Sequence, residues 1–238
     1  MAFRPARDSA EAIRSRRPGQ PLQDPFGVEV VFFHDVLCAW SYLADARLDV
    51  LRAELGEQVR WSYRGYPLRP DEQALDKKER QLLARNVRRV AKEPEGRGVV
   101  ADLWTGRDAP VTSLPPLVAL EAARVQGEEL HDGLLRALRR AAFLRGLNVT
   151  RRDVLLEVAG TVGLDETRFL RDLDDPRSFD RLQAGVDDAE SMGIRGVPAV
   201  IIGDEWMMQG CREVQEYRSV IEKYLAERTP VAAMRVLH

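Results

Sequence analysis

The sequence predicts an α/β fold in which an early β-α-β unit and a late β-β-α unit are separated by a long block of helices. Three observations indicate this order. Two short apolar runs with an amphipathic segment between them occupy residues 28–68, and two further short runs flank a glycine at residues 198–210. Between them, residues 70–192 show only helical periodicity.

The first unit begins with the run VEVVFF at residues 28–33, whose β-branched and aromatic side chains suit a buried strand. Apolar residues then recur at helical spacing from Leu43 to Leu51, and Gly56 is expected to end this helix. Residues 58–68 alternate apolar and polar side chains, which is typical of a second strand. A strand, a helix and a strand of these lengths predict a right-handed crossover with parallel strands.

The second unit lies near the C-terminus. Two short apolar runs flank Gly203-Asp204, a pattern that predicts a two-residue hairpin. A last amphipathic helix follows over residues 214–225. The block between the two units, residues 70–192, predicts about five helices, the last of them broken near Pro176.

This order of elements is that of a thioredoxin fold, βαβ then ββα, with an all-helical domain inserted between its two halves. The expected organisation is a flexible N-terminal arm at 1–26, the first half of the core at 27–69, the helical insertion at 70–192, the second half of the core at 193–228, and a C-terminal tail at 229–238.

Composition excludes several classes of function. The 36 basic and 38 acidic residues leave a net charge of −2, so no global attraction to nucleic acid or to an anionic membrane is expected. Two cysteines are too few for a secreted disulfide framework. The N-terminus lacks the apolar segment of a signal peptide, and no run approaches the roughly 18 apolar residues of a membrane span. These features predict a cytoplasmic protein.

One short motif carries reactive chemistry. Cys38-Ala39-Trp40-Ser41 stands where the first strand gives way to the helix. Unsatisfied N–H groups and the helix dipole stabilise a thiolate there, and the Ser41 hydroxyl can donate a hydrogen bond to the sulfur. We therefore expect a lowered pKa and catalytic roles for Cys38 and Ser41. The alternative is a buried apolar cysteine that happens to begin a helix.

The serine limits what this thiol can accomplish. An oxidase cycle needs a second thiol to close an internal disulfide or to release a mixed disulfide. With Ser41 in that place, Cys38 can attack a disulfide, but an outside thiol must resolve the product. Net oxidation of dithiols by the motif alone is therefore not expected.

The CAWS motif, together with Gly196-Val197-Pro198 before the hairpin, resembles the DsbA family of thioredoxin-fold proteins. The most similar branch groups FrnE-like oxidoreductases with 2-hydroxychromene-2-carboxylate isomerases and kappa-class glutathione transferases. The likeness covers about residues 28–226, and three further segments share it: Tyr66–Pro70, Ala142–Gly146 and Val162–Asp165. FrnE-like proteins carry cysteine at both ends of the motif, whereas the transferases and isomerases carry serine at both. This chain has the thiol of one group and the hydroxyl of the other.

The resemblance implies a second half of the site. Pro198 is expected to follow a cis peptide bond and to lie against Cys38. The Val197 backbone would then be free to pair with an extended substrate, and Trp40 would cover the sulfur. Trp40, Val197 and Pro198 are thus the expected substrate-binding residues. The alternative for Pro198 is an ordinary trans proline at the first residue of a strand.

Four other residues have open roles. His34 is expected either to tune the thiolate or to be a half-buried strand-end residue, and Asp35 either to cap the helix or to lie under the site. Cys211 is expected to be a spectator, too far from Cys38 for a disulfide. Arg212 stands about where glutathione-binding relatives place an acid, which disfavours glutathione. No spacing typical of metal ligands is found, so no metal is expected.

These observations favour a DsbA-like thiol oxidoreductase that works through a mixed disulfide at Cys38. One alternative is a glutathione-dependent transferase or isomerase, with glutathione as co-substrate. Another is a non-catalytic thioredoxin-fold module that binds a peptide. The expected partner is a thiol or disulfide substrate, either a peptide or a small molecule, with no tightly bound cofactor, no nucleic acid and no membrane. The oligomeric state stays open, with a homodimer as one option.

Overall fold

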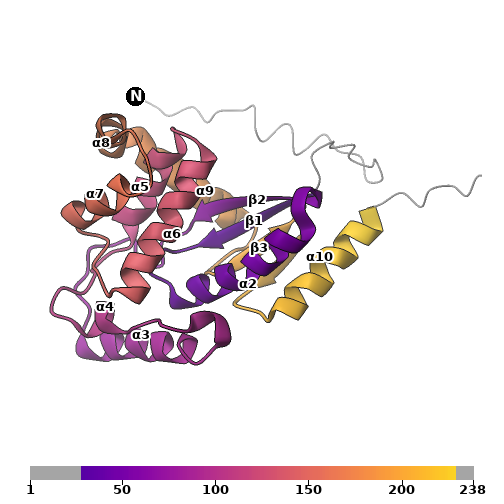
Figure 1. Cartoon of the computed structure of the whole chain (residues 1–238), viewed down its shortest axis with the longest axis horizontal. Helices are drawn as coiled ribbons and strands as arrows, with labels where there is room; N and C mark the ends of the chain where they lie inside the picture. Colours follow the sequence, from indigo (N-terminus) through magenta and orange to yellow (C-terminus); the bar gives the residue numbers. More distant parts are fainter. Residues whose placement is uncertain (1–27, 229–238) are drawn as a thin grey trace, which may run out of the picture.

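Four strands form one mixed sheet in the order β2-β1-β3-β4 (Figure 1). In the computed structural model, which describes residues 28–228, strands β1 and β2 are parallel, while β3 is antiparallel to both β1 and β4. The predicted parallel β-α-β unit and late hairpin are therefore confirmed. The expected arm at 1–26 and tail at 229–238 lie outside the described residues. The strands span Val28–His34 (β1), Val59–Gly65 (β2), Ala199–Ile202 (β3) and Trp206–Gln209 (β4).

Two helices of the core pack along each other. Helix α2 spans Ala39–Leu55 and α10 spans Val214–Arg228. Gly56 ends α2 with a φ of 50°, a left-handed value that favours glycine at this position. In Figure 1, α10 lies beside α2 and away from the helices of the middle of the chain.

The middle of the chain is helical, but it contains more helices than the sequence indicated. Seven α-helices lie between β2 and β3, where about five were expected. The difference arises because α4 has only four residues, too few to show a period, and because Asp175 separates α8 from α9 as an N-cap. The helices span Lys77–Val90 (α3), Asp102–Thr105 (α4), Leu114–Arg124 (α5), Glu128–Leu144 (α6), Arg152–Gly160 (α7), Glu166–Asp174 (α8) and Pro176–Ser191 (α9), and two 3-10 turns span Gly56–Gln58 (η1) and Pro94–Gly96 (η2).

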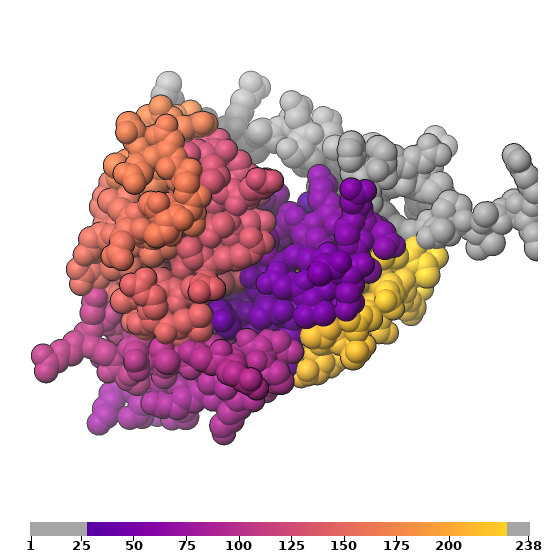
Figure 2. Space-filling model, viewed as in Figure 1, coloured from indigo at the N-terminus to yellow at the C-terminus, as the bar shows by residue number. Residues whose placement is uncertain are grey.

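Alternate residues of β1 belong to two hydrophobic cores. Val30 and Phe32 join a large core that continues from α2 into the helices of the middle of the chain. Phe33 joins a smaller core with Ala189 of α9, and α9 also packs against β2. Figure 2 shows the middle helices, coloured magenta to orange, packed directly against the indigo residues of the first half of the core. The inner strands β1 and β3 are thus mostly buried, which explains their nearly continuous apolar sequences.

A buried ion-pair network joins α2 to the inserted helices. The Asp45 carboxylate of α2 pairs with Arg139 of α6 and with Arg52, whose Nη2 lies 2.9 Å away, and it accepts the Tyr63 hydroxyl at 3.0 Å. Burial acts to raise the pKa of Asp45, but the two guanidinium groups outweigh it and hold this pKa below its usual value. These ion pairs therefore link α2 of the core to α6 of the inserted helices.

The hairpin is one residue longer than the sequence predicted. Ile202 pairs with Trp206, so Gly203, Asp204 and Glu205 form a three-residue turn instead of a two-residue one. The register follows from packing, because the Trp206 ring meets the Tyr224 ring of α10 edge-on at 5.2 Å. Both Gly203 and Asp204 have positive φ values, of 56° and 65°.

Within residues 28–228, no helix combines the length and the apolar character that crossing a lipid bilayer requires.

Gly203→Ala should destabilise the protein more than Gly210→Ala, although both glycines have positive φ. A Cβ at residue 203 would lie 2.0 Å from the Tyr224 hydroxyl oxygen, whereas one at residue 210 meets nothing within 4 Å. We expect Gly203→Ala to lower the free energy of unfolding by about 2–4 kcal/mol and the control by about 1–2 kcal/mol, measured by urea denaturation. Equal losses would show that Tyr224 does not constrain the turn.

Candidate active site

The turn between β1 and α2 is held by a buried carboxylate. Asp35 is 1% exposed, and its two oxygens accept the backbone N–H groups of Leu37 and Leu68, each at 2.8 Å. Leu68 belongs to the loop after β2, so one side chain joins the two loops that flank the start of α2. Of the two roles expected for Asp35, the structure shows the position under the site and not the helix cap.

Cys38 itself occupies the N-cap position of α2. Its backbone is extended, with φ −84° and ψ 112°, and its carbonyl accepts the Tyr42 N–H at 3.0 Å, which begins the helix. The thiol points across to the second half of the core, where Sγ donates to the Val197 carbonyl oxygen at 3.8 Å. Residues 159 positions apart in the sequence therefore meet at the sulfur.

The Val197–Pro198 peptide bond is cis, as the sequence predicted. The Pro198 carbonyl accepts the Gly210 N–H at 2.8 Å and so belongs to the hairpin. Val197 precedes β3, and among residues 28–228 its N–H donates no hydrogen bond. The backbone of Val197 therefore lies beside the thiol with its donor unused.

The expected lowering of the Cys38 pKa is contradicted by the structure. Burial of the thiol raises its pKa above the usual value, and the nearby Asp35 carboxylate raises it further. The Ser41 hydroxyl and the first N–H groups of α2 act in the predicted, lowering direction, but burial outweighs them. The sequence showed the helix terminus but could not show how much of the fold closes over it.

Ser41 lies in the first turn of α2, as predicted, but its hydroxyl is not hydrogen-bonded to a described residue. Its side chain is fully buried, and its hydroxyl finds no hydrogen-bond partner among the described residues. A thiolate at Cys38 would give it an acceptor, which is why Ser41 lowers the pKa of this thiol. The hydroxyl can thus stabilise the charged sulfur that a reaction requires.

A cavity of about 300 Å³ opens at the thiol. Trp40 lines it as expected, and the guanidinium carbon of Arg89 lies 5.1 Å from the centre of the Trp40 ring. The other side of this cavity, which the sequence did not predict, comes from the loop after β2 and from the inserted helices. These lining residues are Leu68, Arg69, Leu83, Asn86, Val87 and Trp104.

Part of this cavity wall could have been predicted from the sequence. Leu68 and Arg69 lie within the Tyr66–Pro70 segment that carries the family resemblance, and Leu83, Asn86 and Val87 share one face of a helix by their spacing. Trp104 could not be predicted in this way, because α4 has only four residues and is too short to show a periodic pattern.

His34 does not tune the thiol through a hydrogen bond. Its ring is fully buried, 5.9 Å from the ring of Phe32 and 5.8 Å from that of Tyr63, and neither ring nitrogen has a hydrogen-bond partner among the described residues. Burial, assisted by the Arg139 charge, lowers the pKa of His34 well below its usual value. The residue is thus a neutral core histidine, and more deeply buried than the half-buried alternative assumed.

Cys211 lies against Arg47 of α2, and a negative charge on Cys38 acts to raise its pKa. Both cysteines are free, and Cys211 Sγ accepts from Arg47 Nη1 at 3.6 Å. Burial raises the pKa of Cys211 to about 11, against the lowering effect of Arg47. Arg212 donates its Nε to the Gln209 carbonyl at 3.1 Å, so this side chain closes the end of β4.

One group of side chains in the described part of the chain has the donor types of a metal site. Glu128, His131 and Asp132 bring their ligand atoms within 4.8 Å of one another at the start of α6. The Arg124 guanidinium already contacts both Glu128 and His131, whose Nε2 lies 2.7 Å from Arg124 Nη2. A cation bound there would meet this fixed positive charge, so the donor set does not fit a metal.

The model of the DSBA-like thioredoxin domain family matches residues 29–222. The chain belongs to this family. Among solved structures, the domain is similar to a putative protein disulfide isomerase from Nitrosomonas europaea, with a TM-score of 0.77 and 16% identity over 84% of this chain and 98% of that one. It is also similar to the cytosolic disulfide reductase DsbM from Pseudomonas aeruginosa, solved with GSH, with a TM-score of 0.62 and 21% identity over 84% and 96% of the chains.

A curated relative of this DSBA-like domain has a different description. The ClpXP adapter protein SpxH of Halalkalibacterium halodurans is 27% identical over 190 residues, which cover 73% of this chain and 58% of that protein. The chain thus spans less than two thirds of the length of this relative. The TM-scores show that this domain shares the fold of the two solved structures, and at identities of 16% and 21% the similarity establishes the fold alone.

Alkylation of Cys38 should keep accelerating with pH beyond pH 8.5. Because the thiolate is the nucleophile and burial raises the pKa of Cys38, the rate should rise about tenfold per pH unit through this range. Iodoacetamide labelling followed by peptide mapping measures Cys38 and Cys211 separately. A plateau for Cys38 below about pH 8 would restore the expectation that was drawn from the helix terminus.

His34→Phe should flatten the loss of stability at acidic pH. The pKa of His34 is lowered in the folded protein, so the unfolded chain takes up the proton first. The stability of the neutral, buried His34 is therefore present above the unfolded pKa of about 6.5 and lost as the pH falls below it. Urea denaturation between about pH 7 and pH 5 measures this loss. Parallel profiles for the two proteins would contradict the prediction.

Proposed function

We propose that this domain is a monothiol exchange protein, which forms a mixed disulfide between Cys38 and a substrate. The observation that carries the proposal is the contact between Cys38 Sγ and the Val197 carbonyl oxygen, at 3.8 Å, beside a backbone donor that no described residue uses. This arrangement presents a sulfur and an unpaired length of backbone to the same ligand.

The exchange needs neither a metal nor an organic cofactor. The Cys38 thiolate attacks one sulfur of a substrate disulfide, a new S–S bond forms, and the old bond breaks. Its electron pair leaves with the other substrate sulfur, which takes up the proton that Cys38 gave to solvent. A second, outside thiolate then attacks the substrate sulfur of the mixed disulfide, forms a new S–S bond with it, and releases Cys38 as the thiolate. Glutathione is a candidate for this outside thiol.

The motif supports exchange more strongly than net oxidation. Ser41 stands where a resolving thiol would be needed, and Cys211 is a free thiol that accepts a hydrogen bond from Arg47 and has a raised pKa. Each turnover therefore depends on a thiol from outside the described chain. The buried Ser41 hydroxyl supplies the hydrogen bond that a thiolate, as attacking or leaving group, would accept.

The geometry beside the thiol suits an extended peptide. A substrate strand that pairs with the Val197 backbone would run past Cys38, with a side chain in the 300 Å³ cavity. Trp40, Leu68 and Trp104 give this cavity apolar walls. We propose a peptide thiol or disulfide as the substrate and the cytoplasm as the location, with no nucleic acid or membrane as partner.

A second candidate is a non-catalytic module that holds a peptide at the same edge. Two observations favour it: burial raises the pKa of Cys38, and the curated relative is described as an adapter protein. An adapter needs the Val197 edge and the cavity but no thiolate. A glutathione-dependent transferase is less well supported, because Arg212 is used to close β4 at the place where an acid would hold the glutathione amine.

Oxidised glutathione should label Cys38 of the wild-type protein as a mixed disulfide, detected by intact mass and peptide mapping, while insulin reduction stays slow. Ser41→Cys should raise insulin reductase activity at least about tenfold, because it restores an internal resolving thiol. Ser41→Ala is the matched control, since it removes the hydroxyl without adding a thiol, and it should not gain activity. Cys38→Ser should abolish labelling at this site.

Two outcomes would contradict the exchange function. If the wild-type protein already reduces insulin as fast as Ser41→Cys, another thiol resolves the intermediate. If Cys38 takes up no glutathione at alkaline pH while a peptide still binds, the non-catalytic module is the correct function.

A further inference from the structure

Helix α3 carries a concentration of positive charge that the folded chain does not neutralise. It contains six basic residues and one acidic residue, in a protein whose net charge is −2. The one acid, Glu79, is used in the capping box with Asp76, where its side chain accepts the Asp76 N–H at 2.8 Å. Within residues 28–228, none of the six basic side chains forms an ion pair; they are Lys77, Lys78, Arg80, Arg85, Arg88 and Arg89.

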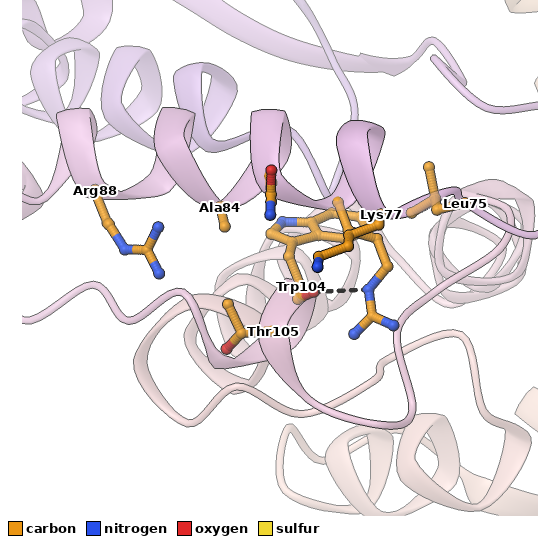
Figure 3. A pocket seen from close by; sticks show the side chains of 8 residues that line it. Leu75, Lys77, Ala84, Arg88, Trp104 and Thr105 are labelled. Carbon is orange, nitrogen blue, oxygen red and sulfur yellow. Dashed lines mark hydrogen bonds between the residues drawn. The ribbon is translucent and has the colours of Figure 1, made fainter.

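Three of these cations line one cavity. Lys77, Arg80 and Arg88 lie on the same face of α3, and with Trp104 and Thr105 of α4 they line an open cavity of about 400 Å³ (Figure 3). We call this cavity the basic pocket. Figure 3 shows Lys77 and Arg88 at opposite ends of it, with the small Ala84 between them.

Arg80 is fixed in this pocket by the backbone of α4. Its Nε donates to the Trp104 carbonyl at 2.9 Å, and its Nη2 donates to the Gly106 carbonyl. Both acceptors are neutral, so the charge of the guanidinium is positioned but not cancelled. The side chains of Lys77 and Arg88 make no hydrogen bond to any described residue and stay available to a ligand.

The basic pocket adjoins the thiol cavity. Trp104 lines both, and the neighbouring face of α3 supplies Leu83, Asn86 and Val87 to the cavity around Cys38. The two cavities thus lie against the same buried Trp104 side chain, so one polypeptide that passes Trp104 could contact both.

The spacing of the charges selects an extended ligand. Lys77 and Arg88 are eleven residues apart on one helix, which corresponds to about 16 Å along its axis. A single phosphate or carboxylate cannot contact both ends. Several carboxylates on one chain can, and acidic side chains of a polypeptide provide this arrangement. The whole chain is slightly acidic, so such recognition would be local to α3 and not a property of the net charge.

We propose that the basic pocket binds acidic side chains of the polypeptide whose cysteine or disulfide meets Cys38. The inference rests on the proposed function for the reactive step and adds the class of substrate: a peptide thiol or disulfide flanked by Asp or Glu. Lys77, Arg80 and Arg88 determine this specificity, and α3 sets the distance between the acidic segment and the sulfur.

Two matched peptides test the proposal. Both carry one cysteine activated as a mixed disulfide with 2-thiopyridine and have blocked termini; one has Glu residues on both sides of the cysteine, and the other has Gln in their place. Attack by Cys38 forms the Cys38–peptide disulfide, breaks the bond to the pyridyl sulfur, and releases pyridine-2-thiolate, which is followed by absorbance. The Cys211→Ser background leaves Cys38 as the reacting thiol.

Two double variants separate the pocket from the general charge of α3. Lys77→Gln with Arg88→Gln removes two cations of the basic pocket, whereas Lys78→Gln with Arg85→Gln removes two exposed cations of the same helix that do not line it. None of these four side chains forms an ion pair with a described residue, so neither change should unfold the protein.

At low ionic strength we expect the parent protein to react about five-fold faster with the acidic peptide than with the neutral one. The pocket variant should lose this preference, and the control variant should keep most of it. Equal rates for the two peptides in the parent protein, or an equal loss in both variants, would overturn the proposal.

A binding measurement separates failure of the pocket from failure of the exchange function. The same two peptides with serine in place of cysteine are titrated by calorimetry against the three proteins. If the acidic serine peptide binds with the same dependence on Lys77 and Arg88 but no thiolate is released from the activated peptides, the pocket stands and the exchange function fails. If neither peptide binds preferentially, the assignment of the pocket is wrong.

Discussion

The arrangement of the thiol site depends on the buried carboxylate of Asp35. Its oxygens accept N–H groups from the turn before Cys38 and from the loop after β2, so it fixes the sulfur relative to the opposite wall of the cavity. The same charge opposes formation of a second negative charge at Cys38, whose pKa burial has already raised. One group therefore builds the site and restrains its reactivity, which leaves the Ser41 hydroxyl and the helix terminus to stabilise the thiolate.

Much of the fold could be predicted from the sequence, because most of its elements show a local pattern of apolar residues. The run at residues 28–33, the helical period after Cys38 and the alternation before Gly65 each describe a single element, and their order determines the parallel pairing. The short α4 and the length of the hairpin turn were missed for the opposite reason. The turn is set by contact between Trp206 and Tyr224, which a pattern within one segment does not contain.

Part of the candidate site could be predicted from the sequence, and part could not. Cys38, Ser41 and the cis bond before Pro198 were predictable, because a short motif and a family resemblance carry them. The direction of the Cys38 pKa was not, since it depends on how closely distant segments surround the thiol. His34 shows the same limit: its position four residues before Cys38 suggested a partner for the thiolate, yet its ring faces Phe32 and Tyr63.

Arg80 connects the two cavities in a way that constrains how the protein can change. Its guanidinium supplies charge to the basic pocket, and its hydrogen bonds hold the backbone of α4, which carries the Trp104 wall of the thiol cavity. Helix α4 has four residues and cannot form without such support. A substitution at Arg80 would therefore alter ligand charge preference and cavity shape in one step. A change in charge preference that leaves the thiol cavity intact would have to come from residues that line the basic pocket alone, such as Lys77 and Arg88.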